Sequence, residues 1–295
     1  MLEKLKERVC EQNLQLVKYG LVVLTWGNVS ALSEDGKYVV IKPSGVSYDN
    51  MKAGDMVVTD RAGHIVEGDL RPSTDLATHL ALYDAFPGIG GAVHTHSRYA
   101  VAAAQAGLDL PCYGTTHADY FYGAVPCARE LTAEEIEEAY ERNTGLVIAE
   151  TFRARGIDPL AVPAVLVKSH GPFTWGKTPE KAVENALVLD ECAHMALLTR
   201  LFDPSAAPAA QCIQDKHYFR TEINYKRECR YDPQAPHTCC RHLRHGPDRL
   251  YEKSAELRRD CDRSRFPHST GRKGREPGRA VRAPRRERHD GRPCR

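Results

Sequence analysis

The sequence has no apolar run of about 18 residues, the length that a helix needs to span a bilayer. Its N-terminus, MLEKLKERVC, includes acidic side chains and no long apolar stretch, which argues against a secretory signal. No internal repeat is visible either. From these absences we expect a cytoplasmic protein without membrane contacts.

The cysteines of the first 220 residues lack the close spacing of zinc-finger ligands. Cys10, Cys112, Cys127, Cys192 and Cys212 are well separated along the chain, and no export route that would oxidise them is visible. We therefore interpret these five thiols as reduced and structural.

The chain has 295 residues, of which 42% are hydrophobic, and this is enough for one large domain or two ordinary ones. Residues 221–295 contain 21 Lys and Arg against 11 Asp and Glu, a net charge of +10, whereas residues 1–220 carry a net charge of −8. This asymmetry predicts two chemically different parts, a domain over 1–220 and a basic tail over 221–295.

Alternating helix and strand patterns over residues 1–220 predict an α/β domain. Thr132 and Glu135 form a capping box that starts a helix, whose acidic face we interpret as solvated surface. Thr178 and Pro179 start the last helix of this domain. We also expect helices over 2–19 and 73–86, strands within 21–32, 37–46, 55–60, 89–97 and 164–170, and a Gly-Pro turn after the last strand.

The segment 221–295 holds 18 arginines and five cysteines but almost no β-branched residues. It cannot bury enough apolar surface to offset its ordering entropy, so we expect it to be disordered. Basic tails can bind nucleic-acid phosphates, but here no regular interleaving of aromatic residues and no nucleic-acid motif accompanies the charge. We therefore do not expect the tail to bind nucleic acid.

The stretch GAVHTHSRYA, residues 91–100, places two histidines in a predicted strand. Side chains alternate along a strand, so His94 and His96 point to the same face. Either the pair holds a metal or the two imidazoles pack in the core. His170, at the end of a later strand, supplies a third imidazole, and three neutral imidazoles can hold a catalytic divalent metal with one position open for substrate.

Other residues near these motifs have two interpretations each. Asp75 could add a carboxylate to the metal, or it could be a helix N-terminal charge that the macrodipole stabilises. In the loop GTTHADYFYG, Asp119 could exchange protons with a bound substrate, or it could cap a turn. His79 and His117 lack a comparable context, and we interpret them as ordinary histidines.

Three short polar turns precede the histidine strand: WGNVS (26–30), KPSG (42–45) and PSTD (72–75). Each offers hydroxyls and free backbone amides, which are the groups that cradle a phosphate. Together they predict an anionic small molecule beside a metal.

The motifs LTWGNVSA, IKPSGV, PSTD, AVHTHSRYA, GTTHADYFYG, SHGPFTWGK and DKHYFR follow one another in this order. Through these motifs, residues 1 to about 220 resemble the class II aldolase and adducin family. The motif THADYFYG resembles the L-ribulose-5-phosphate 4-epimerase branch of that family in particular. The resemblance implies a three-layer α/β/α sandwich around a central mixed, largely antiparallel sheet. It also implies a homotetramer with sites between subunits.

The resemblance further implies roles for individual residues. A zinc ion, or another divalent ion such as Mn2+, would be bound by Asp75, His94, His96 and His170, and Asp119 matches the acid/base position. The positions implied for the sugar-phosphate substrate are Gly27, Asn28, Ser44, Gly45, Ser73 and Thr74.

The implied activity interconverts L-ribulose 5-phosphate and D-xylulose 5-phosphate in pentose catabolism, with arabinose or ascorbate as the source. The bond between C3 and C4 breaks by a retro-aldol step and forms again on the other face of the aldehyde, while a metal stabilises the developing charge. Two other functions stay open. One is a class II sugar-phosphate aldolase that releases its aldehyde, and the other is a non-catalytic, adducin-like binding module.

One family position has no counterpart in this chain. The family ends in a short stretch with paired tyrosines, one of which acts from a neighbouring subunit, whereas this chain continues for 75 residues after Arg220. Tyr225 and Tyr231 do not lie in the family's context, so the role is transferred to neither. We hypothesise that a frame change near codon 221 replaced the native terminus, and an intact reading frame in resequenced DNA would refute this.

Overall fold

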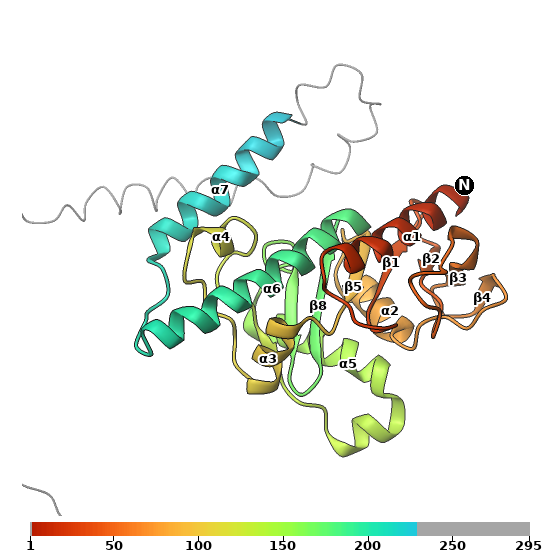
Figure 1. Ribbon diagram of the computed structural model, residues 1–295, viewed down its shortest axis with the longest axis horizontal. Helices are drawn as coiled ribbons and strands as arrows, with labels where there is room; N and C mark the ends of the chain where they lie inside the picture. The colour runs from red at the N-terminus through yellow and green to blue at the C-terminus, as the bar shows by residue number, and fades with distance from the viewer. Residues whose placement is uncertain (1, 229–295) are drawn as a thin grey trace, which may run out of the picture. The chain divides into compact units, whose positions relative to one another are not determined.

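The computed structural model describes residues 2–228, with side chains described up to residue 220 (Figure 1). The helices are α1 (Leu2–Lys18), the 3-10 helix η1 (Ala53–Asp55), α2 (Leu76–Ala85), α3 (Arg98–Ala106), α4 (Thr115–Ala118), α5 (Ala133–Arg155), α6 (Pro179–Phe202) and α7 (Gln211–Glu228). The strands are β1 (Asn28–Leu32), β2 (Tyr38–Ile41), β3 (Val57–Asp60), β4 (Ile65–Glu67), β5 (Gly91–His94), β6 (Cys127–Ala128), β7 (Ala164–Val167) and β8 (Gly171–Gly176).

The strands form one sheet in the order β4-β3-β2-β1-β5-β8-β7-β6. Neighbouring strands are antiparallel except β6 and β7, which are parallel, so the mixed, largely antiparallel sheet expected from the resemblance is confirmed. His94 at the end of β5 pairs with Phe173 near the start of β8. Residues that follow β5 therefore lie beside residues that precede β8.

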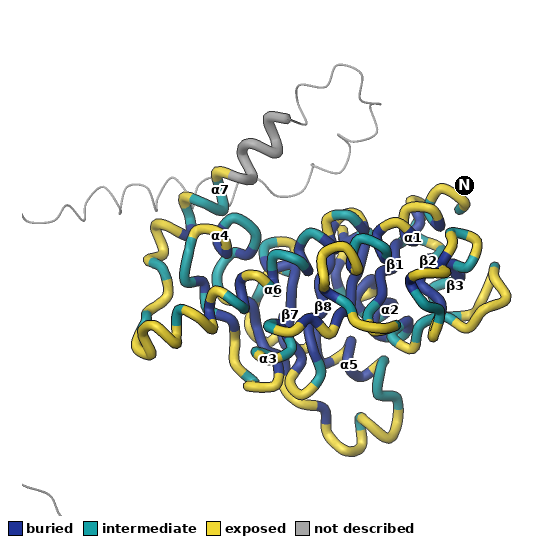
Figure 2. Tube along the Cα trace, viewed as in Figure 1, coloured by how far each residue is buried: buried dark blue, intermediate teal, exposed yellow. Residues whose placement is uncertain are grey.

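Helices cover both faces of this sheet. In β2, Val40 packs with Val9 of α1, whereas its neighbour Val39 points to the opposite face and packs in the same cluster as Leu80 of α2. Helix α6 packs on the α1 side of β5, and α5 packs on α2. The three-layer arrangement is thus confirmed, and buried residues follow the strands between the two helical layers (Figure 2).

Helix α5 approaches α2 closely at Gly145. A Cβ at this glycine would lie 2.6 Å from Cβ of Ala81 and 3.0 Å from the carbonyl oxygen of Thr78. Glycine permits this approach although it costs about 1 kcal/mol relative to alanine inside a helix. The hydroxyl of Thr78 also donates a hydrogen bond to the carbonyl of Glu141. The contact therefore brings α5 to the N-terminal end of α2.

The two helix starts expected from capping patterns are confirmed. Thr132 accepts a hydrogen bond from the amide of Glu135, and the Glu135 carboxylate accepts one from the Thr132 amide. Thr178 caps α6, with Pro179 in its first turn. Helix α5 also contains a break that we did not expect, because the backbone of Ala139 is extended, with φ −165° and ψ 73°.

Two expectations about strands are wrong in their bounds. Within 21–32 only β1 is a strand, because the backbone turns at Leu24 and Gly27, which both have positive φ. The expected Gly-Pro turn is instead the start of β8, and the chain turns earlier, at Ser169 with φ 62°. Proline is tolerated among the first residues of a strand, where its missing N–H least disturbs the hydrogen bonds between strands.

Helix α7 crosses residue 220, where we expected the domain to end. Residues 221–228 are helical, so the expectation of disorder is wrong for these residues. The rest of the expected tail, with Tyr231, lies outside the described residues. Over residues 2–228, none of the helices has the length and apolar character required to cross a membrane.

Candidate active site

Three histidines meet where β5 and β8 lie side by side. His94 ends β5, His96 follows two residues later, and His170 immediately precedes β8. One ring nitrogen from each histidine lies within 4.8 Å of the other two. His96 lies beyond the strand, so the loop after β5, and not alternation along the strand, brings it to His94.

His94 is oriented so that its Nε2 faces the other histidines. Its Nδ1 lies 3.0 Å from the carbonyl oxygen of Pro172 and donates a hydrogen bond there, while its Nε2 lies 3.0 Å from Nε2 of His96. The ring stacks on Phe173 with 4.2 Å between centroids. A carbonyl acceptor at Nδ1 fixes the tautomer in which Nε2 has a free lone pair, which is the form that binds a metal.

Burial favours neutral imidazoles in this cluster. Burial and the nearby His94 lower the pKa of His170 to about 3, and the same two causes lower the pKa of His96. Nδ1 of His170 is buried without a hydrogen-bond partner among the described residues. Metal binding needs unprotonated ring nitrogens that converge on one point, so these three residues fit a divalent transition metal.

Asp75 is the N-cap residue of α2 and lines the same cavity as the histidines. Its side chain does not cap the helix, and its Oδ2 instead accepts a hydrogen bond from Nδ2 of Asn28 at 2.7 Å. Burial raises the pKa of Asp75, but electrostatic interactions with His94 and His79 and the bond from Asn28 outweigh burial, so the pKa is lowered overall. Asp75 is not part of the three-histidine group, and its role as a metal ligand stays a prediction.

The three polar turns expected to bind phosphate line this cavity together. Nδ2 of Asn28 donates to the Ser73 hydroxyl at 3.0 Å, and the Ser73 amide donates to the carbonyl of Lys42 at 3.0 Å. These bonds join the turns into one wall beside the histidines. The lining residues include every predicted substrate position: Gly27, Asn28, Ser44, Gly45, Ser73 and Thr74.

The first of these turns depends on a glycine. Gly27 has φ +84°, and a Cβ there would lie 2.8 Å from the Val22 side chain and 2.9 Å from the His94 carbonyl oxygen. The buried hydroxyl of Tyr48 donates to the carbonyl oxygens of Gly27 and Trp26, at 2.8 and 3.2 Å. Glycine is required here because the turn is pressed against the end of the histidine strand.

Lys42 is a cavity residue that the sequence reasoning missed. It is only 2% exposed, its Nζ donates to the carbonyl of Pro43 at 3.3 Å, and it lies 4.8 Å from the centroid of the Tyr48 ring. Burial lowers its pKa, and it forms no ion pair with a carboxylate among the described residues. A buried cation of this kind is stabilised when an anion binds beside it. The available signal was its place at the start of the KPSG turn.

Tyr140 and Glu141 also line the cavity and were not predicted. They are the first residues after the break in α5, and the ring centroid of Tyr140 lies 5.7 Å from that of His170. Glu137, on the same helix, is exposed as expected for a solvated acidic face, but Glu141 is not part of that face. No residue pattern in the sequence indicates the break, so the sequence held no signal for this pair.

Asp119 does not share this cavity. It is the C-cap residue of α4 and is absent from the lining residues. Its Oδ1 lies 3.0 Å from Nδ1 of His217 and 3.9 Å from the guanidinium of Arg220, both on α7. Within one chain the acid/base candidate and the histidine cluster are therefore separate, and the catalytic role of Asp119 stays a prediction.

The two histidines interpreted as ordinary are buried and bonded to neighbours. Nδ1 of His79 lies 2.7 Å from the Ser30 hydroxyl, and Nε2 of His117 lies 2.8 Å from the carbonyl oxygen of Gly123. Burial lowers the pKa of each to about 4. Neither histidine lines the cavity.

Comparison with known sequences gives a consistent result. A family model described as the class II aldolase and adducin N-terminal domain matches residues 7–197. The L-ribulose-5-phosphate 4-epimerase UlaF of Salmonella paratyphi B is 52% identical over 219 residues, which cover 74% of this chain and 95% of that protein. The protein of the same name from Salmonella typhi matches to the same extent.

Solved structures of this family have the same fold. An L-fuculose 1-phosphate aldolase gives a TM-score of 0.63 at 23% identity, over 74% of this chain and 96% of that one. The L-fuculose-1-phosphate aldolase of Thermus thermophilus gives 0.53 at 28% identity, over 70% of this chain and 99% of that one. The sequence relatives are thus named epimerases, whereas these two structures are named aldolases.

Proposed function

The chain belongs to the class II aldolase and adducin family, and from that premise we propose that it is an L-ribulose-5-phosphate 4-epimerase, an isomerase. We propose that it acts in the cytoplasm, in the use of arabinose or ascorbate. One observation supports this most directly: a single cavity joins three histidines to a buried lysine and three polar turns. Such a cavity suits a sugar phosphate, with its ketose oxygens at the histidines and its phosphate at the turns.

The ligands that we propose for zinc, or for another divalent ion such as Mn2+, are His94, His96 and His170, with Asp75 as a carboxylate ligand. When bound, such an ion supplies Lewis-acid stabilisation for negative charge on the ketose oxygens. Asn28 orients the Asp75 carboxylate through the bond of 2.7 Å. The carbonyl of Pro172 orients the His94 ring through its Nδ1.

The phosphate end of the substrate is assigned to Lys42 and the polar turns. A bound phosphate would give Lys42 the counter-charge that it lacks, and hydroxyls such as those of Ser73 and Thr74 would donate to the phosphate oxygens. The phosphate belongs to the aldehyde fragment that separates when the C3–C4 bond breaks. A site that holds the phosphate therefore keeps this fragment in place until the bond forms again.

Proton transfer at the C4 oxygen is assigned to Asp119. Because Asp119 does not line the cavity of its own chain, we propose a homotetramer in which each site forms between two subunits. In this assembly, Asp119 of one chain reaches the cavity of the next. His217 orients the carboxylate through its bond of 3.0 Å.

A coupled assay for conversion of L-ribulose 5-phosphate to D-xylulose 5-phosphate tests the function. We expect the purified full-length chain to turn over, to lose activity with a chelator and to regain it with Zn2+ or Mn2+. A chain that ends at residue 228, where the described helix α7 ends, shows whether the remainder affects turnover. Release of free glycolaldehyde phosphate without inversion at C4 would instead indicate an aldolase. Activity insensitive to chelation would contradict the metal assignment.

A further inference from the structure

Helix α5 is interrupted close to the cavity. The extended backbone of Ala139 separates a short first segment from the rest of the helix. Tyr140 and Glu141, which follow the break, are the residues of α5 that line the cavity. The direction in which the helix resumes therefore decides where these two side chains lie.

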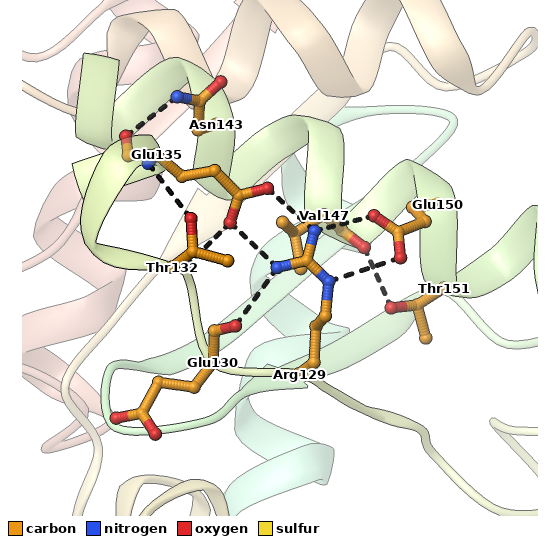
Figure 3. A network of polar contacts seen from close by, with 8 residues as sticks. All are labelled: Arg129, Glu130, Thr132, Glu135, Asn143, Val147, Glu150 and Thr151. Atoms are coloured by element: carbon orange, nitrogen blue, oxygen red, sulfur yellow. Dashed lines mark hydrogen bonds and ion pairs between the residues drawn. The ribbon is translucent and has the colours of Figure 1, made fainter. Parts of the chain in front are cut away.

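Arg129, in the loop before α5, bonds to both sides of this break (Figure 3). Its Nη1 and Nη2 each donate to the carboxylate of Glu135, before the break, at 2.8 Å. Its Nη2 and Nε donate to the carboxylate of Glu150, after the break, at 2.9 and 3.3 Å. Nη1 also donates to the carbonyl oxygen of Glu130 at 3.2 Å. These are five hydrogen bonds, and a guanidinium has five N–H groups.

Exposed ion pairs usually contribute little, because solvent screens them and their side chains lose entropy. The Arg129 cluster differs, because one planar guanidinium joins two carboxylates that would otherwise repel each other, with two bonds to each. The bonds from Arg129 are the main reason that the pKa of Glu135 falls to about 2. Arg129 thus bridges the two segments of α5, on either side of the break.

Other contacts anchor the residues after the break. Nδ2 of Asn143 donates to the carbonyl oxygen of Glu135 at 2.8 Å (Figure 3), and the Thr78 hydroxyl of α2 donates to the carbonyl of Glu141. The planes of the Tyr140 and His170 rings are 32° apart. The segment from Glu135 to Asn143 is therefore fixed to the rest of α5, to α2 and to the histidine cluster.

We propose that Arg129 is a positioning residue for the active site: by joining Glu135 to Glu150 it fixes the break in α5 and so places Tyr140 and Glu141 in the cavity wall. Arg129 is not a lining residue, so its effect on the site passes through α5. The kinetic part of this inference rests on the proposed epimerase function, whereas the structural part does not.

Two variants of Arg129 and a matched control test the proposal. Arg129→Met removes all five donors, and Arg129→Lys keeps the charge but cannot bridge both carboxylates with paired bonds. The control is Arg155→Met. Arg155 lies at the far end of α5, donates to Asp109 at 2.9 and 2.8 Å and to the carbonyl oxygen of Cys127 at 3.1 Å, and has a side chain 42% exposed against 41% for Arg129.

The first measurement is amide hydrogen exchange in α5, followed by mass spectrometry of the full-length protein. We expect exchange around residues 139–143 to become about fivefold faster in Arg129→Met and to be partly restored in Arg129→Lys. Arg155→Met should leave exchange at these residues as in the wild type. The second measurement is kcat/KM in the coupled assay, which we expect to fall about tenfold in Arg129→Met relative to Arg155→Met.

Either of two results overturns the proposal. In the first, exchange at 139–143 is the same in Arg129→Met as in Arg155→Met. In the second, exchange rises in Arg129→Met but kcat/KM stays at the level of Arg155→Met. A wild-type chain that does not turn over L-ribulose 5-phosphate refutes the proposed function instead, and the exchange comparison still decides whether Arg129 fixes the break.

Discussion

The histidine cavity and the Asp119 cluster are built in different ways, although family motifs assign both to one site. The cavity is lined from several strand ends and turns, so the sheet sets the positions of His94 and His170, and the loop after β5 places His96 beside them. Asp119, by contrast, caps the C-terminal end of the four-residue helix α4, and it contacts His217 and Arg220 on α7. The difference teaches that one chain contains the proposed metal and phosphate site but not the proposed proton-transfer group beside it.

The strongest test of this comparison separates the two regions onto different chains. We expect His94→Asn to lose about a thousandfold in kcat/KM because it removes a metal ligand, and Asp119→Asn to lose between about a hundredfold and ten-thousandfold while it retains metal. If sites form between subunits, mixed oligomers of the two variants should regain part of the activity, since some sites then contain both intact residues. Metal content and turnover of the mixture are measured after co-refolding.

The matched control for this experiment is each variant mixed with itself, which should stay inactive. Mixed oligomers that show no more than the sum of the separate activities would contradict the proposal that each site forms between two subunits. That result would mean that Asp119 serves only its own chain or has no role in turnover.

The second test lies within the cavity and concerns binding. Lys42→Met keeps the buried apolar stem but removes the cation, so we expect KM for the sugar phosphate to rise by about tenfold to a hundredfold. Because Asp119 and the histidines are unchanged, kcat should fall far less than KM rises. Inhibition by inorganic phosphate should weaken in parallel. If kcat falls in Lys42→Met while KM and phosphate inhibition are unchanged, Lys42 does not bind the phosphate.

The third test lies on the Asp119 side and concerns stability in acid. His117 is 4% exposed, and burial lowers its pKa from 6.5 to about 4. As the pH falls from about 6.5 to 4, the unfolded chain binds a proton that the folded chain does not, so up to about 3 kcal/mol of stability is lost. His117→Gln can still donate to the carbonyl of Gly123 but does not titrate. Its free energy of unfolding in urea should therefore fall less over this range.

The measurement compares wild type and His117→Gln at about pH 7 and about pH 4.5. Equal losses of stability in the two proteins would show that His117 does not contribute to acid unfolding. A loss confined to wild type would support the burial of this histidine beside the Asp119 cluster.

Local patterns in the sequence correctly predicted those features that depend on a few neighbouring residues. The Thr132–Glu135 box and the Thr178–Pro179 pair start α5 and α6 as expected, because capping is decided within one helical turn. The polar turns that contain Gly27 and Ser73 also lie where their composition indicated. The histidines were recognised for the same reason, since ligand chemistry depends on residue type.

The sequence by itself therefore determined the α/β class and the helix starts, and its motifs predicted candidate residues for a metal and a phosphate. Only the tertiary structure decided that His96 meets His94 from a loop, that Lys42 is buried without a carboxylate partner, and that the break at Ala139 turns Tyr140 and Glu141 into the cavity. It also decided that Asp119 lies outside that cavity. The physical reason is that these features depend on sheet order and on side-chain contacts between residues far apart in the chain, which no local pattern encodes.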